Sequence, residues 1–367
     1  MNTYQQDKEF LNKYLKLVEL TNGDKRVLIT PDLQGRVLTS TPSGEDGYSC
    51  GWINYKLIES QKPLPHCNNW GGEDRFWLGP EGGQYAIFFA PGTSKKFDFE
   101  DWQAPALIDT KAWDTLHANA NSVCFSTREV LTNWSGNTLS VQLDREVKLL
   151  SDSQTAAAIG VKLPANVEYV GFESDNKLTN IGTQAWDKET GALSIWILGQ
   201  FIPSDENNVI LPTKASSEAK INDSYFGKIE ESRLQQQADT FYFKGDGNKR
   251  GKIGIPSQMT IPTVFALDRA NNILTIVKFS FSETATDYIN SMWEYQEKPY
   301  QGDVINSYND GPLEDGTVMG GFYEIETSSQ ALFLAPQQSH THTNTTIHVK
   351  GNLSDLESIL EEMMYNL

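Results

Sequence analysis

The sequence has little cysteine, little histidine and no long apolar run. Its 367 residues include only three cysteines and five histidines. The thiols of Cys50, Cys67 and Cys124 are too few and too scattered for a disulfide framework or a thiolate zinc site. No stretch of about 18 apolar residues occurs, so no segment is expected to cross a membrane as a helix. These absences exclude a small disulfide-stapled protein and a helical membrane protein.

Positive charge is also scarce. The chain has 30 Lys and Arg against 48 Asp and Glu, which gives a formal net charge of −18. Such a surface repels phosphate backbones and anionic lipid, so nucleic acid and membrane surfaces are poor partners. The same charge would also serve simple solubility. The N-terminus lacks the apolar core of a signal peptide. We therefore expect a cytoplasmic protein as written, or a periplasmic or extracellular one if a leader has been removed.

Several catalytic signatures are missing as well. The sequence contains no G-x-S-x-G elbow, no CxxC pair and no dinucleotide-binding glycine fingerprint. A single H-x-H pattern (340–342) is weak support for a metal site. We therefore predict neither a cofactor nor a bound metal.

Short, turn-punctuated strands dominate what is present. The chain carries nine Trp, fourteen Tyr and seventeen Phe, residues that suit strands and can also stack on sugar rings. Strand-like patterns occur at 26–30, 35–41, 85–90, 123–132, 139–150, 156–163, 167–181, 192–201, 273–281, 322–327 and 345–351. Without intervening helices, this spacing predicts an all-β sandwich rather than a parallel sheet. We find no internal repeat or linker, so residues 1–367 are expected to form one domain.

Two terminal segments carry a helical pattern instead. Near the start, apolar residues at 10, 11, 14, 15 and 18 form one stripe. At the end, Leu356, Ile359, Leu360 and Met363 repeat that spacing, and Ser354 is a candidate N-cap. We therefore expect short helices at both ends of an otherwise β chain.

The densest unusual segment is HCNNWGGEDRFWLGPEGGQ (66–84). Its glycines allow close approach of a ligand to the backbone, and Arg75 offers a forked donor for hydroxyls or a carboxylate. Trp70 or Trp77 could supply a stacking face. The remaining candidate ligand-binding residues of this segment are Glu73, Glu81 and His66. The alternative is a structural crossover in which Arg75 pairs with Glu73, Asp74 or Glu81.

A second concentration of candidate residues lies in 307–351. Glu326 occupies a probable strand, and His340 and His342 would share a face if their run is extended. A carboxylate and an imidazole in one cleft can transfer protons at a sugar ring. Asp310, in an Asn-Asp-Gly turn, is a further candidate for ligand binding. Alternatively, His340 and His342 lie in a solvated turn.

Three segments resemble galactose-mutarotase-like (aldose 1-epimerase-like) proteins. They are ITPDLQGRVLTSTPSG (29–44), KLTNIGTQAWDKETGALSIWILGQF (177–201) and GFYEIETSSQALFLAPQQSHTHTNTTIHVKG (321–351). GGEDRFWLGPEGGQ (71–84) and WINYKLI (52–58) are similar to those of mutarotase-like proteins of unknown function from Bacteroidetes. The resemblance covers most of the chain and implies a β-supersandwich with short terminal helices.

The resemblance also implies roles for single residues. The glutamate of the family's LET motif, its catalytic base, matches Glu326 in IET. The family's acid is a histidine shortly after the LTN strand, and ETGALSIWILG (189–199) contains none. His342, His340 or His66 would then have to serve as the acid.

Two classes of function remain open from the sequence. One is an enzyme that acts on a sugar, either epimerase-like or a hydrolase or lyase. The other is a non-catalytic carbohydrate-binding protein or a module associated with such enzymes. Either would take a small saccharide or an oligosaccharide as ligand. A structural or protein-binding module is a third reading.

Overall fold

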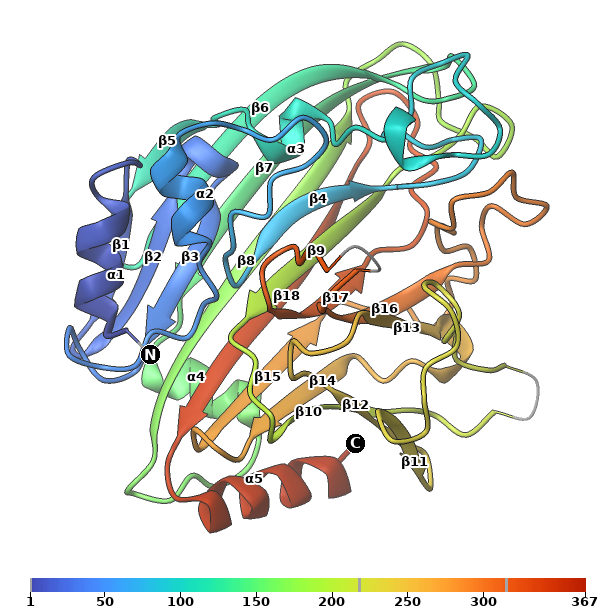
Figure 1. Ribbon diagram of the computed structural model, residues 1–367. Coiled ribbons are helices and arrows are strands. Elements are labelled where there is room, and N and C mark those ends of the chain that lie inside the picture. The colour runs from blue at the N-terminus through green and yellow to red at the C-terminus, as the bar shows by residue number, and fades with distance from the viewer. Residues whose placement is uncertain (1, 217–218, 314–315) are drawn as a thin grey trace.

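Antiparallel strands form most of the structure. The computed structural model describes residues 2–216, 219–313 and 316–367, and within these ranges the strands form three sheets (Figure 1). The largest sheet has ten strands, in the spatial order β11 (Leu234–Gln237), β12 (Thr240–Lys244), β10 (Asn207–Pro212), β14 (Thr263–Asp268), β15 (Ile273–Phe279), β18 (Ser339–Lys350), β8 (Glu168–Asn180), β7 (Thr138–Leu149), β6 (Ser122–Thr132) and β5 (Asp114–Ala118).

Two smaller sheets accompany it. The five-stranded sheet has the order β13 (Gly251–Pro256), β16 (Asp303–Asn309), β17 (Tyr323–Ser328), β9 (Ser194–Phe201) and β4 (Arg75–Gly79). The three-stranded sheet consists of β1 (Val18–Asn22), β2 (Lys25–Thr30) and β3 (Arg36–Thr41). The predicted all-β architecture is confirmed.

The five-stranded sheet packs one face against the ten-stranded sheet. Side chains alternate along a strand, so β17 sends Tyr323 and Ile325 to this inner face. There they join a core with Val209 and Val264 of the large sheet. A second core lies between β4 and β9 and strands β6 to β8, and includes Phe76 and Ile197. The inner face is thus apolar, and the outer face of the five-stranded sheet is left for other side chains.

Helices cover edges and outer surfaces. They are α1 (Tyr4–Leu11), α2 (Tyr55–Ser60), α3 (Ala106–Asp109), α4 (Asp152–Ile159) and α5 (Leu353–Tyr365), with single 3₁₀ turns at Pro31–Leu33, Phe99–Asp101 and Ser257–Met259. Leu356, Ile359, Leu360 and Met363 of α5 pack on Ile276 and Ile347, on the face of the large sheet that points away from the five-stranded sheet (Figure 1). The predicted C-terminal stripe is confirmed, although Asn352 rather than Ser354 is the N-cap.

Three local predictions were wrong. The N-terminal helix ends at Leu11, and Val18 already begins β1. The run 156–163, expected to be a strand, lies partly in α4, because Ser151 and Gln154 form a capping box and Gly160 ends the helix at a φ of 78°. The run 85–90 forms no regular strand. Its apolar side chains fill the core from a loop, as buried Phe88 and Phe89 show.

Candidate functional site

The outer face of the five-stranded sheet carries a dense set of polar and aromatic side chains. Cross-strand partners share a face, and one row of partners runs Arg75, Leu198, Glu326 and Asn306. The rows beside it contribute Trp77, Trp196 and Ser328 on one side and Gln200, Glu324 and Tyr308 on the other. Strand alternation therefore places charge, amide and indole groups together on one face.

Glu326 lies at the centre of this face and is fully buried. Its Oε2 accepts hydrogen bonds from Trp196 Nε1 and Lys252 Nζ, both at 2.9 Å. Among the described residues, no donor reaches its other oxygen, Oε1. A buried carboxylate oxygen without a donor is costly, so this atom is suited to accept a proton or a hydrogen bond from a ligand.

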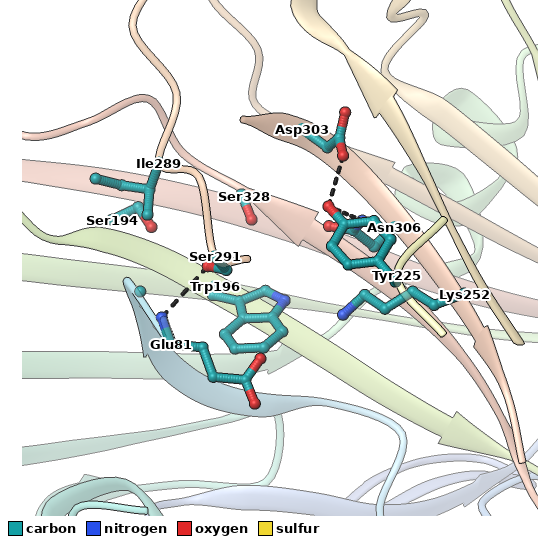
Figure 2. A pocket seen from close by; sticks show the side chains of 11 residues that line it. Glu81, Ser194, Trp196, Tyr225, Lys252, Ile289, Ser291, Asp303, Asn306 and Ser328 are labelled. Carbon is teal, nitrogen blue, oxygen red and sulfur yellow. Dashed lines mark hydrogen bonds between the residues drawn. The ribbon is translucent and has the colours of Figure 1, made fainter. Parts of the chain in front are cut away.

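A small pocket is lined by Trp196 and Lys252, the two residues that donate to Glu326 (Figure 2). Lys252 reaches it from β13 and lies 5.0 Å from the ring centroid of Trp196. The backbone N–H of Glu81, just after β4, donates to Ser291 Oγ over 3.3 Å, which ties two loops together across the pocket. The interior volume is about 20 Å³, room for about one water molecule. A larger ligand therefore requires side chains at the mouth to move.

Glu81 has the electrostatics of a proton donor near neutral pH. Burial raises the pKa of its carboxyl to about 7, and the nearby carboxylate of Glu326 acts in the same direction. Lys252 opposes this rise. Burial alone would lower the pKa of the Lys252 ammonium, but Glu326 and Glu81 raise it above the ordinary value. The pocket thus brings an easily protonated carboxyl close to a carboxylate paired with a cation.

The far wall of the pocket contains a third carboxyl, Asp303 on β16. The hydroxyl of Tyr225 donates to Asp303 Oδ2 over 2.6 Å, and Asn306 Nδ2 donates to the Tyr225 oxygen over 3.2 Å (Figure 2). Burial raises the pKa of Asp303 to about 6. Tyr225 comes from the loop between β10 and β11, so this hydrogen bond fixes a loop side chain over the pocket.

Arg75 pairs with a residue that the sequence did not suggest. Its Nη2 donates to Glu324 Oε1 over 2.5 Å, and its guanidinium lies 5.1 Å from the Trp77 ring centroid. Burial raises the pKa of Glu324 to about 7, although Arg75 acts to lower it. The expected alternatives Glu73, Asp74 and Glu81 are not its ion-pair partners. Arg75, Trp77 and Glu326 lie on the same outer face of the sheet, and Glu81 follows directly after β4.

The histidines do not join this site. His342 is fully buried in β18, where its Nε2 lies 3.0 Å from Thr327 Oγ1 and its Nδ1 lies 3.1 Å from Ser280 Oγ. Thr327 follows Glu326 in β17 and therefore points to the opposite face. Burial lowers the pKa of His342 to about 3, so its ring stays neutral. His340, partly buried in the same strand, is not in a turn. The predicted pairing of Glu326 with His342 is thus not formed.

Four other candidates serve local structure elsewhere. Buried Trp70 donates from Nε1 to the Asp109 carbonyl at 3.2 Å, and His66 Nδ1 lies 2.6 Å from the Trp102 carbonyl oxygen. Glu73 is buried against His348, with 2.7 Å between Oε2 and Nε2. Asp310 accepts from the Tyr308 hydroxyl and from two glycine N–H groups of its own loop. All four lie away from the pocket wall.

Of the pocket residues, the sequence pointed to Glu81 but not to Trp196, Lys252, Tyr225, Asp303 and Asn306. The alternation in SIWILGQF places Trp196 on the face of Gln200. Lys252 belongs to β13. Tyr225, Asp303 and Asn306 carry no local signal. Strand pairing places Asn306 opposite Glu326, and Tyr225 contacts Asp303 and Asn306 from a loop.

The described residues contain no group of three or more His, Cys, Asp or Glu side chains placed to hold a metal ion. They also contain no helix long and apolar enough to cross a membrane. The arrangement of groups instead suits proton transfer. The carboxyl of Glu81, whose pKa is raised to about 7, can hold a proton near neutral pH. Glu326 offers an oxygen that has no donor among the described residues.

Structural relatives show the fold. The Slr1438 protein from Synechocystis sp. PCC 6803 matches with a TM-score of 0.56 and 12% identity, over 92% of this chain and 96% of that one. A candidate aldose 1-epimerase from Klebsiella pneumoniae gives 0.52 and 10%, over 99% and 94% of the two chains. A galactose mutarotase related enzyme from Lactobacillus acidophilus gives 0.50 and 8%, over 92% and 98%. The predicted galactose-mutarotase-like supersandwich is confirmed.

In sequence, no functionally curated protein matches the chain significantly. A protein family does match, over residues 2–365. The chain therefore belongs to a family of unknown function, DUF6786, and its fold is that of the galactose mutarotases.

Proposed function

We propose that the protein binds a saccharide on the outer face of its five-stranded sheet. One observation carries this proposal: three buried polar atoms on this face have no partner within the described part of the chain. Trp77 Nε1, Gln200 Oε1 and Glu326 Oε1 are all buried and without a partner among the described residues. Buried polar groups are normally satisfied, so a shared face with one free donor and two free acceptors favours a ligand that offers both. A sugar hydroxyl is such a group.

The aromatic side chains of the same face support this choice. Trp77 and Trp196 meet edge to face, with ring centroids 5.7 Å apart. Indole rings beside hydroxyl-binding groups suit a pyranose, which has apolar C–H faces and a polar rim. The relatives of the same fold include proteins described as a galactose mutarotase related enzyme and a candidate aldose 1-epimerase. Their fold is shared, and their sugar chemistry is the model for this proposal.

We further infer that the site performs acid–base chemistry at the anomeric centre, with Glu326 as base and Glu81 as acid. In anomerisation, the base removes the proton from the anomeric hydroxyl while the acid protonates the ring oxygen. The ring C–O bond breaks, and closure on the other carbonyl face returns both protons. Glu81 has a pKa of about 7 and can donate near neutrality. In this proposal Glu81 takes the role of the histidine acid that the sequence lacks.

Binding without catalysis is the second candidate, and one observation favours it. Oε2 of Glu326 is already occupied by Lys252 and Trp196, so only Oε1 is left to contact a ligand. The pocket is also small in this conformation. Both candidates require the same binding face, so they differ only in whether the bound sugar reacts.

The deciding experiment follows anomerisation of glucose and galactose by NMR, with saccharide binding measured in parallel by calorimetry. For the enzyme, Glu326→Gln and Glu81→Gln should each lower the rate by roughly 10²–10⁴-fold. Affinity should change far less, because an amide still hydrogen-bonds a hydroxyl. Glu357→Gln in α5 is the control, since Glu357 pairs with Arg269 on the surface.

The outcomes separate the candidates. Sugar binding with no rate above buffer establishes the binding protein and rejects the acid–base role. Rates that survive both substitutions reject these two residues as base and acid. Absence of binding in a wide screen of mono- and oligosaccharides, with folding verified by circular dichroism, rejects the saccharide proposal itself.

A further inference from the structure

We propose that the pocket selects its saccharide by charge, preferring an amino sugar over the matched neutral sugar and rejecting the matched sugar acid. The inference rests on the saccharide site proposed above and adds the class of sugar. The preference for an amino sugar follows from two observations. Two carboxyl groups line the pocket, and the one cation among its described lining residues already pairs with a carboxylate of the protein.

Carboxyl groups outnumber cations at the pocket. Glu81 and Asp303 line its wall, and Glu326 lies directly behind Lys252. Among the described residues that line it, Lys252 is the one cation. Its ammonium already pairs with Glu326 at 2.9 Å, and its side chain is only 12% exposed. Lys252 is therefore committed to a protein carboxylate and is poorly placed to neutralise a carboxylate on a ligand.

The other cations of this face are also engaged. Arg75 is buried and pairs with Glu324 at 2.5 Å. Arg250 lies with its guanidinium 3.8 Å from the ring centroid of Phe226, and it is not among the pocket-lining residues. A ligand carboxylate would therefore meet Glu81 and Asp303, while the one cation among the described lining residues, Lys252, already pairs with Glu326. Like charges brought together in a poorly solvated site repel strongly.

An ammonium group on the ligand could instead pair with Glu81 or Asp303. Glu81 and Asp303 have no lysine or arginine hydrogen-bonded to them among the described contacts. Asp303 accepts from the neutral hydroxyl of Tyr225, and Glu81 is held through its backbone by Ser291. Either carboxylate can pair with a ligand cation, which restores the balance of charge in the pocket. The net charge of −18 attracts cations to the surface as a whole.

The selectivity should depend on pH in a defined direction. Burial raises the pKa of Glu81 to about 7 and that of Asp303 to about 6. Glu81 faces Lys252, Arg250, Glu326 and the Trp293 side chain, while Asp303 faces Lys252, Tyr225 and Asn222. Raising the pH through this range ionises both carboxyls, so the preference for an amino sugar should grow.

The test compares glucosamine, glucose and glucuronate, together with their galacto counterparts, by calorimetry on the full chain. Glucosamine should bind most tightly, and glucuronate at least about tenfold more weakly than glucose. The advantage of glucosamine should be larger at about pH 7 than at about pH 5.5, since ionisation of the carboxyls is linked to binding. Glu81→Gln should reduce that advantage, because it removes one of the two carboxylates that could pair with the ammonium group. Glu357→Gln again serves as the matched surface control.

Each result decides something. Glucuronate binding as tightly as glucose overturns the charge inference and leaves the saccharide site standing. Selectivity unchanged in both Glu81→Gln and Asp303→Asn overturns it as well. If one variant fails to fold, the other variant and the pH series on the wild type carry the test. Absence of binding by every sugar overturns both this inference and the proposed function.

Discussion

At the scale of single residues, the buried charges are the main feature of this protein. Arg145 and Asp74 are both completely buried, and Arg145 Nη2 lies 2.6 Å from Asp74 Oδ1. Ser174 and Asn344 donate to the second oxygen, Oδ2. The carboxylate is thus fully satisfied, which is what makes such a pair tolerable inside a sandwich. Glu326 differs from it because one of its oxygens is free.

Asp74→Asn should therefore destabilise the protein strongly. The substitution leaves the Arg145 guanidinium buried without its counter-charge, and such a loss costs about 3–5 kcal/mol. Urea denaturation at neutral pH would measure it. Glu357→Gln breaks a surface pair with Arg269 and should cost at most about 1 kcal/mol. An equal loss of unfolding free energy in the two variants would show that the buried pair stabilises the protein no more than the surface pair does.

His342 should make stability depend on acid pH. Burial lowers its pKa from 6.5 to about 3 in the folded protein. Between these values the unfolded chain binds the extra proton, so this contribution to stability is lost as the pH falls from about 6.5 towards 3. His342→Asn should flatten the fall in unfolding free energy over that window. His117→Asn, in the exposed strand β5, should not. An unchanged slope in His342→Asn would contradict the assignment.

At the scale of elements, alternation in the strands separates core from site. In β17, Tyr323 and Ile325 enter the core, whereas Glu324 and Glu326 face the outer side. A one-residue shift in register would exchange these sets and bury both carboxylates in an apolar layer. The register of β17 therefore determines both which side chains form the core and which form the candidate site.

Helix α5 should stabilise the sheet that it covers. Leu356 is fully buried against strands of the large sheet. Leu356→Ala removes this contact and leaves a cavity, which should lower the free energy of unfolding by about 2–5 kcal/mol. Chemical denaturation would measure the loss. Glu361→Ala on the exposed side of the same helix is the control. A loss below about 1 kcal/mol for Leu356→Ala would mean that α5 packs only loosely.

At the scale of the whole molecule, the net charge of −18 determines which partners can approach. The protein should show no saturable binding of duplex DNA at physiological salt, because the phosphate backbone is repelled. Fluorescence anisotropy with a labelled duplex would test this, with a basic DNA-binding protein as positive control. Binding that weakens as salt increases would reveal a local basic surface and contradict the expectation.

The sequence by itself determined the all-β class and the C-terminal helix, and it named Arg75, Trp77, Glu81 and Glu326 as separate candidates for a site. These features depend on local patterns: apolar residues alternate in a strand, recur every three to four positions in a helix, and capping residues end helices. Tertiary structure decided the rest. It paired Arg75 with Glu324, brought Lys252 to Glu326 and Asp303 to the same pocket, and placed His342 on the opposite side of the sheet. Such choices depend on which distant strands become neighbours and which face is buried, and no local pattern contains that information.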